Sequence, residues 1–261
     1  MAGRDNRLAP RVRLFEADPE LLRDVPEEQQ EGLRRRFTVP VINLRAGQWD
    51  QPPGDQAAIG VLILKGLIRG EIILFDRCGV ELLGTGDVLQ PWDRPEPASI
   101  PSDSSWEVLV PAQLAVLDRE AAILLGQIPG AVAELFTRVV RRARLLAMQS
   151  AISRIRGISS RLLVLFWFLA DRWGGREAGQ VVLKIPLQHE LLSALVSAER
   201  ASVSRSLKAL SRRGQISRRA DGYWVLHGAP PQDLGELILI QRIEGRNRLA
   251  WRRRVGEAHR G

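Results

Sequence analysis

Residues 181–227, VVLKIPLQHELLSALVSAERASVSRSLKALSRRGQISRRADGYWVLH, decide the fold of the C-terminal part of this chain. The spacing of the leucines predicts a short helix over residues 188–195 and a second helix over residues 199–212. Only the tripeptide Val196-Ser197-Ala198 is left to connect them. Two helices joined by so tight a turn are typical of a helix-turn-helix, whose second helix enters the major groove of DNA.

A basic hairpin follows the second helix. Alternating residues predict strands over 216–219 and 223–226, joined around Asp221-Gly222, which is a favoured hairpin turn. Any single arginine here is explained by a solvated surface, but the order of helix, turn, arginine-led helix and basic hairpin favours a winged DNA-binding domain. The residues that we expect to contact DNA are Gln188, Arg200, Ser202, Ser204, Arg205, Lys208, Arg212 and Arg218.

The charge of the chain also differs between its two halves. The net charge is +8, but residues 1–128 hold 14 Lys+Arg and 20 Asp+Glu, whereas residues 129–261 hold 24 and 10. The first half is therefore acidic and the second half is strongly basic. Such asymmetry indicates that the second half binds a polyanion and that the first half has a different task.

Upstream of the long helices the pattern is that of an antiparallel β-protein. Residues 1–18 are polar and aperiodic, which predicts a mobile lead-in, and residues 19–36 suit one or two short helices. Short apolar runs between glycine turns then predict an antiparallel barrel or sandwich. These runs are 39–44, 61–68, 71–75, 80–83, 88–90, 106–110 and 114–117.

A long helix is predicted to start at Pro129 and to end before Gly157. Its apolar residues recur at spacings of three and four, which is the pattern of a coiled-coil seam, and arginines 138, 141, 142 and 144 flank that seam. Packing on the barrel would also explain the stripe, but its narrowness favours a dimer. The expected seam consists of Val132, Phe136, Val139, Ala143 and Leu146. A second, more buried helix is predicted over 159–173.

The chain resembles the cyclic-AMP receptor/fumarate–nitrate regulator (Crp/Fnr) family of bacterial transcription regulators over residues 19–228. The resemblance is carried by LLVLFWFLADRWG and LQHELLSALVSAERASVSRSLKALSRRGQI in the C-terminal part, and by VLILKGLIRGEIILFD and GTGDVL in the roll. It implies an α+β fold with a cupin-like, cyclic-nucleotide-binding-like β-roll, a dimerisation helix and a winged helix-turn-helix. The division expected is 1–128, 129–157, 158–228 and a basic extension at 229–261.

The resemblance also assigns roles within the second helix. The family pattern small–Arg–Glu–Thr–Val–Ser–Arg aligns with residues 199–205, which implies that Arg200 and Arg205 contact bases and that Ser202 contacts a phosphate. Ala201 stands where the family has a glutamate that accepts a hydrogen bond from cytosine, so we expect a different operator. Ser197 stands where the turn usually has glycine.

The family's best-known effectors lose support in this sequence. After GTGDVL comes QPWD instead of the Gly-Glu pair that holds a ribose, and no arginine follows at 102–106, so cyclic AMP is disfavoured. Cys78 is the only cysteine, which disfavours an iron–sulfur cluster. Haem is disfavoured because all three histidines lie outside the roll. No cofactor is therefore predicted, and the open alternatives are another effector, an anion at the dimer seam, or no effector.

We expect a non-enzymatic, cytoplasmic, homodimeric regulator that binds double-stranded DNA at a pseudo-palindromic operator. The alternative is an architectural or constitutive DNA-binding protein whose roll serves only dimerisation or protein docking. RNA polymerase and an unidentified small molecule are further candidate partners. No P-loop, dinucleotide fingerprint or HExxH motif is present, and the longest apolar run, Leu162–Ala170, is too short to span a membrane. The basic extension has two open interpretations, an arm that binds phosphates or a partner, and a solvated terminus.

Overall fold

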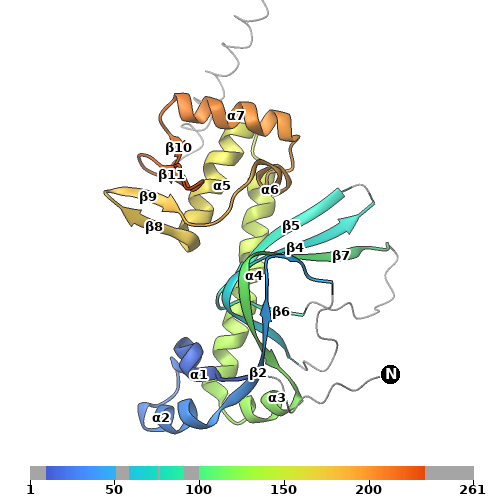
Figure 1. Ribbon diagram of the computed structural model, residues 1–261, viewed down its shortest axis with the longest axis vertical. Helices are drawn as coiled ribbons and strands as arrows, with labels where there is room; N and C mark the ends of the chain where they lie inside the picture. The colour runs from blue at the N-terminus through green and yellow to red at the C-terminus, as the bar shows by residue number, and fades with distance from the viewer. Residues whose placement is uncertain (1–9, 51–58, 76, 91–99, 233–261) are drawn as a thin grey trace, which may run out of the picture. The chain divides into compact units, whose positions relative to one another are not determined.

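A computed structural model describes residues 10–50, 59–75, 77–90 and 100–232 of the chain (Figure 1). The chain forms two compact units, Met1–Leu146 and Ala147–Gly261. The boundary between them lies inside the long helix α4 (Pro129–Ser153). Most of the basic extension expected at 229–261 lies outside the described part, which ends at residue 232.

The first unit is built on an antiparallel β-roll. The path through the sheet runs β1-β2-β7-β4-β5, while β3 pairs with β7 and β6 pairs with β4. The strands are β1 (Arg11–Arg13), β2 (Thr38–Leu44), β3 (Gly47–Gln48), β4 (Gly60–Leu74), β5 (Arg77–Gly84), β6 (Val88–Leu89) and β7 (Asp103–Leu117). The all-antiparallel roll expected from the sequence is therefore confirmed.

The two longest strands each join two of the predicted apolar runs. Strand β4 spans the runs at 61–68 and 71–75, and β7 spans those at 106–110 and 114–117. The pairing of β4 with β7 shifts register around Gly66, where φ is +107°. A Cβ on Gly66 would lie 2.5 Å from the Cα of Ala112, so only glycine allows this approach. Pro111 has no amide hydrogen to donate, so it is tolerated at this register shift, where the regular hydrogen bonding between β4 and β7 is interrupted.

Helices close one end of the roll. They are α1 (Leu14–Ala17), the 3-10 helix η2 (Pro19–Leu22), α2 (Glu27–Arg36), α3 (Arg119–Leu125) and the start of α4. The expectation of a mobile lead-in over residues 1–18 is wrong for residues 10–18. Strand β1 pairs with β2, and the side chains of Leu14 and Phe15 are fully buried. Their burial in the core explains why this short stretch is ordered despite its polar neighbours.

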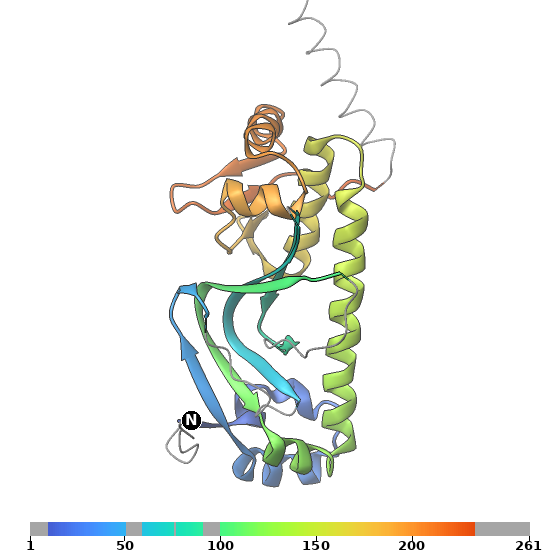
Figure 2. The same ribbon diagram turned by 90° about the vertical axis from the view of Figure 1, so that its right-hand side faces the viewer.

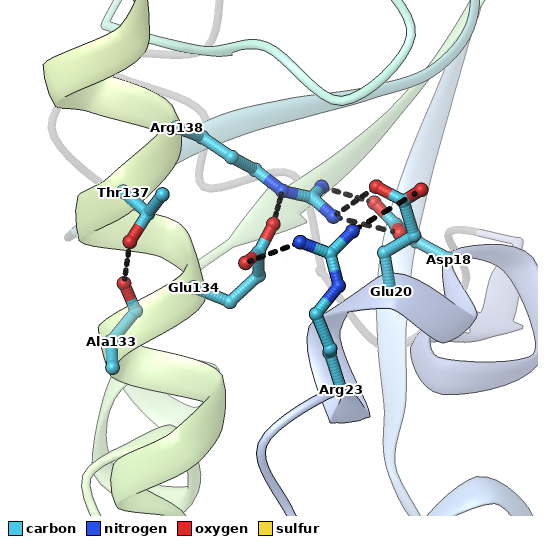
Figure 3. A network of polar contacts seen from close by, with 7 residues as sticks. All are labelled: Asp18, Glu20, Arg23, Ala133, Glu134, Thr137 and Arg138. Carbon is cyan, nitrogen blue, oxygen red and sulfur yellow. Dashed lines mark hydrogen bonds and ion pairs between the residues drawn. The ribbon is translucent and has the colours of Figure 1, made fainter.

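Helix α4 lies along the roll with one face buried (Figure 2). Ala131, Leu135 and Arg138 are buried on this face, and Arg138 is only 2% exposed. The guanidinium of Arg138 makes two hydrogen bonds to the Asp18 carboxylate and one, of 3.0 Å, to Glu134 (Figure 3). Burial alone would lower the pKa of Arg138, but the hydrogen bonds to Asp18 and Glu134 outweigh it and raise the pKa.

A second arginine fixes α4 to the roll one turn later. Arg142 Nε and Nη2 bind the two carboxylate oxygens of Glu81 on β5, at 3.0 and 2.5 Å, and Nη1 donates to the carbonyl of Val88 on β6 at 3.1 Å. Arg138 and Arg142 therefore face the roll. The sequence predicted arginines beside the apolar stripe, but it did not predict that Asp18 and Glu81 bind two of them.

The second unit holds a three-helix core and a four-stranded sheet. Helix α5 (Ile158–Trp173) begins after Gly157, as predicted, and packs on α7. The sheet order is β10-β11-β9-β8. The remaining elements are β8 (Gly174–Glu177), β9 (Gln180–Leu183), α6 (His189–Leu195), α7 (Arg200–Arg212), β10 (Ile216–Arg218) and β11 (Trp224–Leu226). The hairpin β8–β9 was not predicted, and the VVL sequence of β9 is the signal that could have revealed it.

No helix of the described residues has by itself the length and apolar character to cross a membrane. Helices α3 and α4 pass such a test only as a pair, bent by 115° at their junction.

Substituting Asp18→Ala should lower the free energy of unfolding by about 3 kcal/mol, because it leaves a buried guanidinium without one of its two main partners. Urea unfolding of the full chain, followed by tryptophan fluorescence, measures the loss. The control is Glu16→Ala, which breaks an exposed 2.9 Å pair with Arg13 and should cost less than about 1 kcal/mol. Equal losses in both variants would contradict a special role for the buried pair.

Candidate nucleic-acid interface

The helix-turn-helix is positioned by buried leucines. Helix α6 buries Leu191, Leu192 and Leu195, and α7 buries Val203 and, on its following turns, Leu207 and Leu210. These are the inward positions predicted from the sequence. The opposite side of α7 is left to polar and cationic residues, so this helix has one face in the core and one face free for a ligand.

The turn between α6 and α7 needs a left-handed residue, and Ser197 occupies it with φ +50°. Its backbone N–H donates to the carbonyl of Ala194, and the N–H of Ala198 donates to that of Ser193. Arg161 on α5 adds a 2.8 Å hydrogen bond to the carbonyl of Val196. The turn is therefore held in place even though Ser197 lacks the conformational freedom of glycine.

The predicted base-contacting residues lie at the start of α7. Arg200 is its first residue, and Arg200 and Arg205 are both exposed. Arg205 Nη2 donates to Ser202 Oγ at 2.9 Å, which lays the guanidinium along the first turn of the helix. Lys208 and Arg212 are exposed further along α7, and Gln188 is exposed at the residue before α6. The fold thus brings these residues to the surface of the helix-turn-helix.

Ser204 has a partner that the sequence did not reveal. Its Oγ lies 2.9 Å from Nδ1 of His189, the first residue of α6. The two side chains therefore join the two helices of the motif. The sequence did contain one signal for this contact. Ser204 follows the buried residue Val203, so its hydroxyl lies at the edge of the buried face of α7 and is only partly exposed to solvent.

Trp224 links the wing to the helices. Its buried Nε1 donates to the carbonyl of Leu187 at 3.0 Å, and its ring packs on Phe166 and His189. The Arg218 guanidinium lies over the same ring, 5.5 Å from its centroid, and Arg218 Nε donates to the carbonyl of Gly222. Arg218 is thus held against the wing with its charge near the start of α6.

Neighbouring Arg219 differs, because it is already neutralised. Its guanidinium pairs with Glu177 at 2.6 Å and with Asp221 at 2.9 Å. Hydrogen bonds from Lys184 and from Arg219 lower the pKa of Glu177. The sequence did not reveal that Arg219 is paired with Glu177, because Glu177 lies 42 residues earlier in the chain.

The predicted seam of α4 is exposed in the protomer. Phe136 is 68% exposed and Val139 48%, whereas Leu135 on the other face is 7% exposed. The exposed members of the stripe are Val132, Phe136, Val139, Ala143 and Leu146. Among the described residues, no group of three or more His, Cys, Asp or Glu side chains is arranged to hold a metal ion.

Substituting Ser197→Gly should raise the free energy of unfolding by up to about 1 kcal/mol, because glycine removes the strain of a left-handed backbone. Thermal unfolding of both forms measures the effect. Ser193→Gly is the matched control: it places glycine inside α6 and should destabilise by about 0.5–1 kcal/mol. A loss of stability in Ser197→Gly as large as in the control would contradict the strained turn.

Comparison with known proteins agrees with this architecture. Residues 160–227 match the family model of the Crp-like helix-turn-helix domain. No curated protein matches the chain.

Solved structures with the same fold include FixK2 from Bradyrhizobium japonicum, at 15% identity and a TM-score of 0.58, over 74% of this chain and 94% of that one. A CRP/FNR-family transcriptional regulator from Thermus thermophilus is similar at 18% identity and a TM-score of 0.51, over 77% and 97% of the two chains. The c-di-GMP responsive global regulator CLP of Xanthomonas campestris is similar at 17% and 0.52, over 73% and 95%.

These findings assign a Crp-like helix-turn-helix domain to residues 160–227. The chain as a whole shares the α+β fold of solved structures that include CRP/FNR-family transcriptional regulators.

Proposed function

We propose that the protein is a homodimeric, sequence-specific transcription regulator that inserts α7 of each protomer into the major groove of a pseudo-palindromic operator. The observation that carries this proposal is the two-sided character of α7, which buries Val203, Leu207 and Leu210 and exposes Arg200 and Arg205 at its start. In this docking mode the half-sites lie one helical turn, about 34 Å, apart.

The residues divide into two roles. Arg200 and Arg205 read guanine edges, since an arginine can bind O6 and N7 of guanine together. Ala201 offers thymine a methyl contact, so the operator differs from one read by a glutamate. Phosphates fix the register, and the residues that bind them are Gln188, Ser202, Ser204, Lys208, Arg212 and Arg218.

The dimer is formed by the exposed apolar stripe of α4. Its members are apolar and exposed, and they recur at heptad spacing along α4. A second copy of the same stripe is the partner that such a seam fits, because a two-fold interface is self-complementary. The two-fold symmetry of the dimer then matches that of the operator.

For the roll we propose an effector other than cyclic AMP, or none. Arg138 and Arg142 already bind Asp18 and Glu81, so neither guanidinium is free to hold a phosphate. Arg141 and Arg144 are the exposed arginines of this group, and they remain candidates for an anion at the seam. The internal pairs also favour the second candidate function, a constitutive or architectural DNA-binding protein whose roll only dimerises or docks a protein.

Location in the cytoplasm and contact with RNA polymerase complete the proposal. Selection of bound duplexes from a random pool, with and without cell extract, tests its central claim. A palindromic consensus supports a dimeric regulator, and enrichment that depends on the extract supports an effector. Recovery of unrelated sequences would favour the architectural alternative.

Arg200→Ala should weaken binding to the selected duplex by about 1–3 kcal/mol per protomer and relax the preference at one base position, because it removes a base contact. Fluorescence anisotropy on selected and scrambled duplexes measures both. Lys208→Ala is the comparison, since loss of a phosphate contact should weaken the two duplexes alike and reduce the salt dependence. An equal loss on both duplexes for Arg200→Ala would contradict base reading.

Phe136→Glu should convert the dimer to a monomer while leaving the protomer folded, because the side chain is largely exposed and the charge would repel its copy across the seam. Sedimentation velocity measures the mass. The control is Leu135→Ala on the buried face, which should destabilise the protomer by about 2–5 kcal/mol. A Phe136→Glu variant that stays dimeric would show that the seam lies elsewhere.

A further inference from the structure

His189 lies where all parts of the candidate interface meet. It begins α6, its Nδ1 is 2.9 Å from Ser204 Oγ on α7, and its ring stacks on Trp224 of β11 at a centroid distance of 6.4 Å. The side chain is half-buried. Gln188 precedes it, and Arg218 lies over the same indole ring. A phosphate bound by Gln188 and Arg218 would therefore lie beside this imidazole.

The surroundings of His189 disfavour its charged form in the free protein. Burial lowers the pKa of His189 below its ordinary value, and the positive charges of Arg218 on β10 and Arg200 on α7 lower it further. Glu190, the next residue on α6, is the nearest acidic group in the chain sequence and does not reverse the effect. An imidazolium at this position is thus disfavoured by burial first and by the two arginines in addition.

We propose that His189 is a further DNA-contacting residue and that it takes up a proton when the protein binds DNA. The proposal rests on the proposed DNA-binding function. A phosphate that binds Arg218 neutralises one of the two charges that oppose protonation, and it adds negative charge next to the ring. Both changes favour the charged imidazole in the complex over the free protein.

The pair with Ser204 gives the proton a structural consequence. A protonated His189 donates its Nδ1–H to Ser204 Oγ, which leaves the hydroxyl hydrogen of Ser204 free to donate to a phosphate oxygen. The predicted phosphate contact of Ser204 and its observed contact with His189 are then compatible. The proton therefore aligns α6 and α7 for the same strand of DNA.

The sign of the pH dependence follows from linkage. Because DNA raises the pKa of His189 from its lowered value, the bound state holds more protons than the free state, and affinity must rise as pH falls. A rise of one pKa unit corresponds to as much as a tenfold gain in affinity per protomer. We expect about a threefold to tenfold gain per protomer between pH 7.0 and 5.5, a range that avoids the titration of carboxylates and of the terminal amine.

The test uses the full chain with His227→Gln and His259→Gln, which leaves His189 as the only histidine of the three. The dissociation constant for the duplex selected by the protein is measured by anisotropy from pH 5.5 to 7.0 at constant ionic strength. Adding His189→Gln should remove the pH dependence. The single variant His227→Gln is the matched control, because Nε2 of His227 also bonds a serine, Ser217, at 2.8 Å, and this variant should keep the pH dependence that His189→Gln removes.

Nuclear magnetic resonance provides a second, direct measurement that needs no substitution at position 189. The Cε1–H resonance of His189 should titrate at a higher pH in the complex than in the free protein. An unchanged midpoint overturns the proposal, as does a pH dependence that persists in His189→Gln. A protein that binds DNA without pH dependence overturns this inference alone, whereas failure to bind any duplex at low salt overturns the proposed function with it.

Discussion

The buried pair between Arg138 and Asp18 determines how α4 is presented. A guanidinium that is almost fully buried can stay charged only where carboxylates meet it, so Arg138 must face Asp18 and Glu134. This requirement, repeated by Arg142 and Glu81, fixes the rotation of the helix about its axis. The apolar stripe of α4 does not face the roll and is therefore left exposed. The charged contacts thereby specify which face of α4 is free for a partner.

Much of this arrangement could be read from local patterns. The period of Leu191, Leu195, Val203 and Leu207 defined both helices of the motif, and the Asp221-Gly222 turn defined the wing. The prediction of these features is correct because burial on one helical face and a short turn depend on residues that are close in the chain. The sequence marked Ser197 only as a replacement for the usual turn glycine, and its left-handed backbone is seen in the structure.

The features that the sequence did not reveal are long-range pairings of charge. Nothing near Arg138 in the chain indicates Asp18, which is 120 residues away, and so their buried ion pair was not predicted. The same holds for Arg219 and Glu177, and for His189 and Ser204 across two helices. A repeat of arginines along a helix shows that charges are present, but only the fold shows which of them are already paired.

The contact between Arg218 and Trp224 has a consequence for the entropy of binding. A free arginine side chain samples many rotamers, and ordering it costs about 2 kcal/mol. Arg218 is already restrained by the indole face and by the carbonyl of Gly222 when the domain is alone. Part of this loss of side-chain entropy therefore occurs when the domain folds. The loss of entropy that remains when Arg218 binds a duplex is correspondingly smaller.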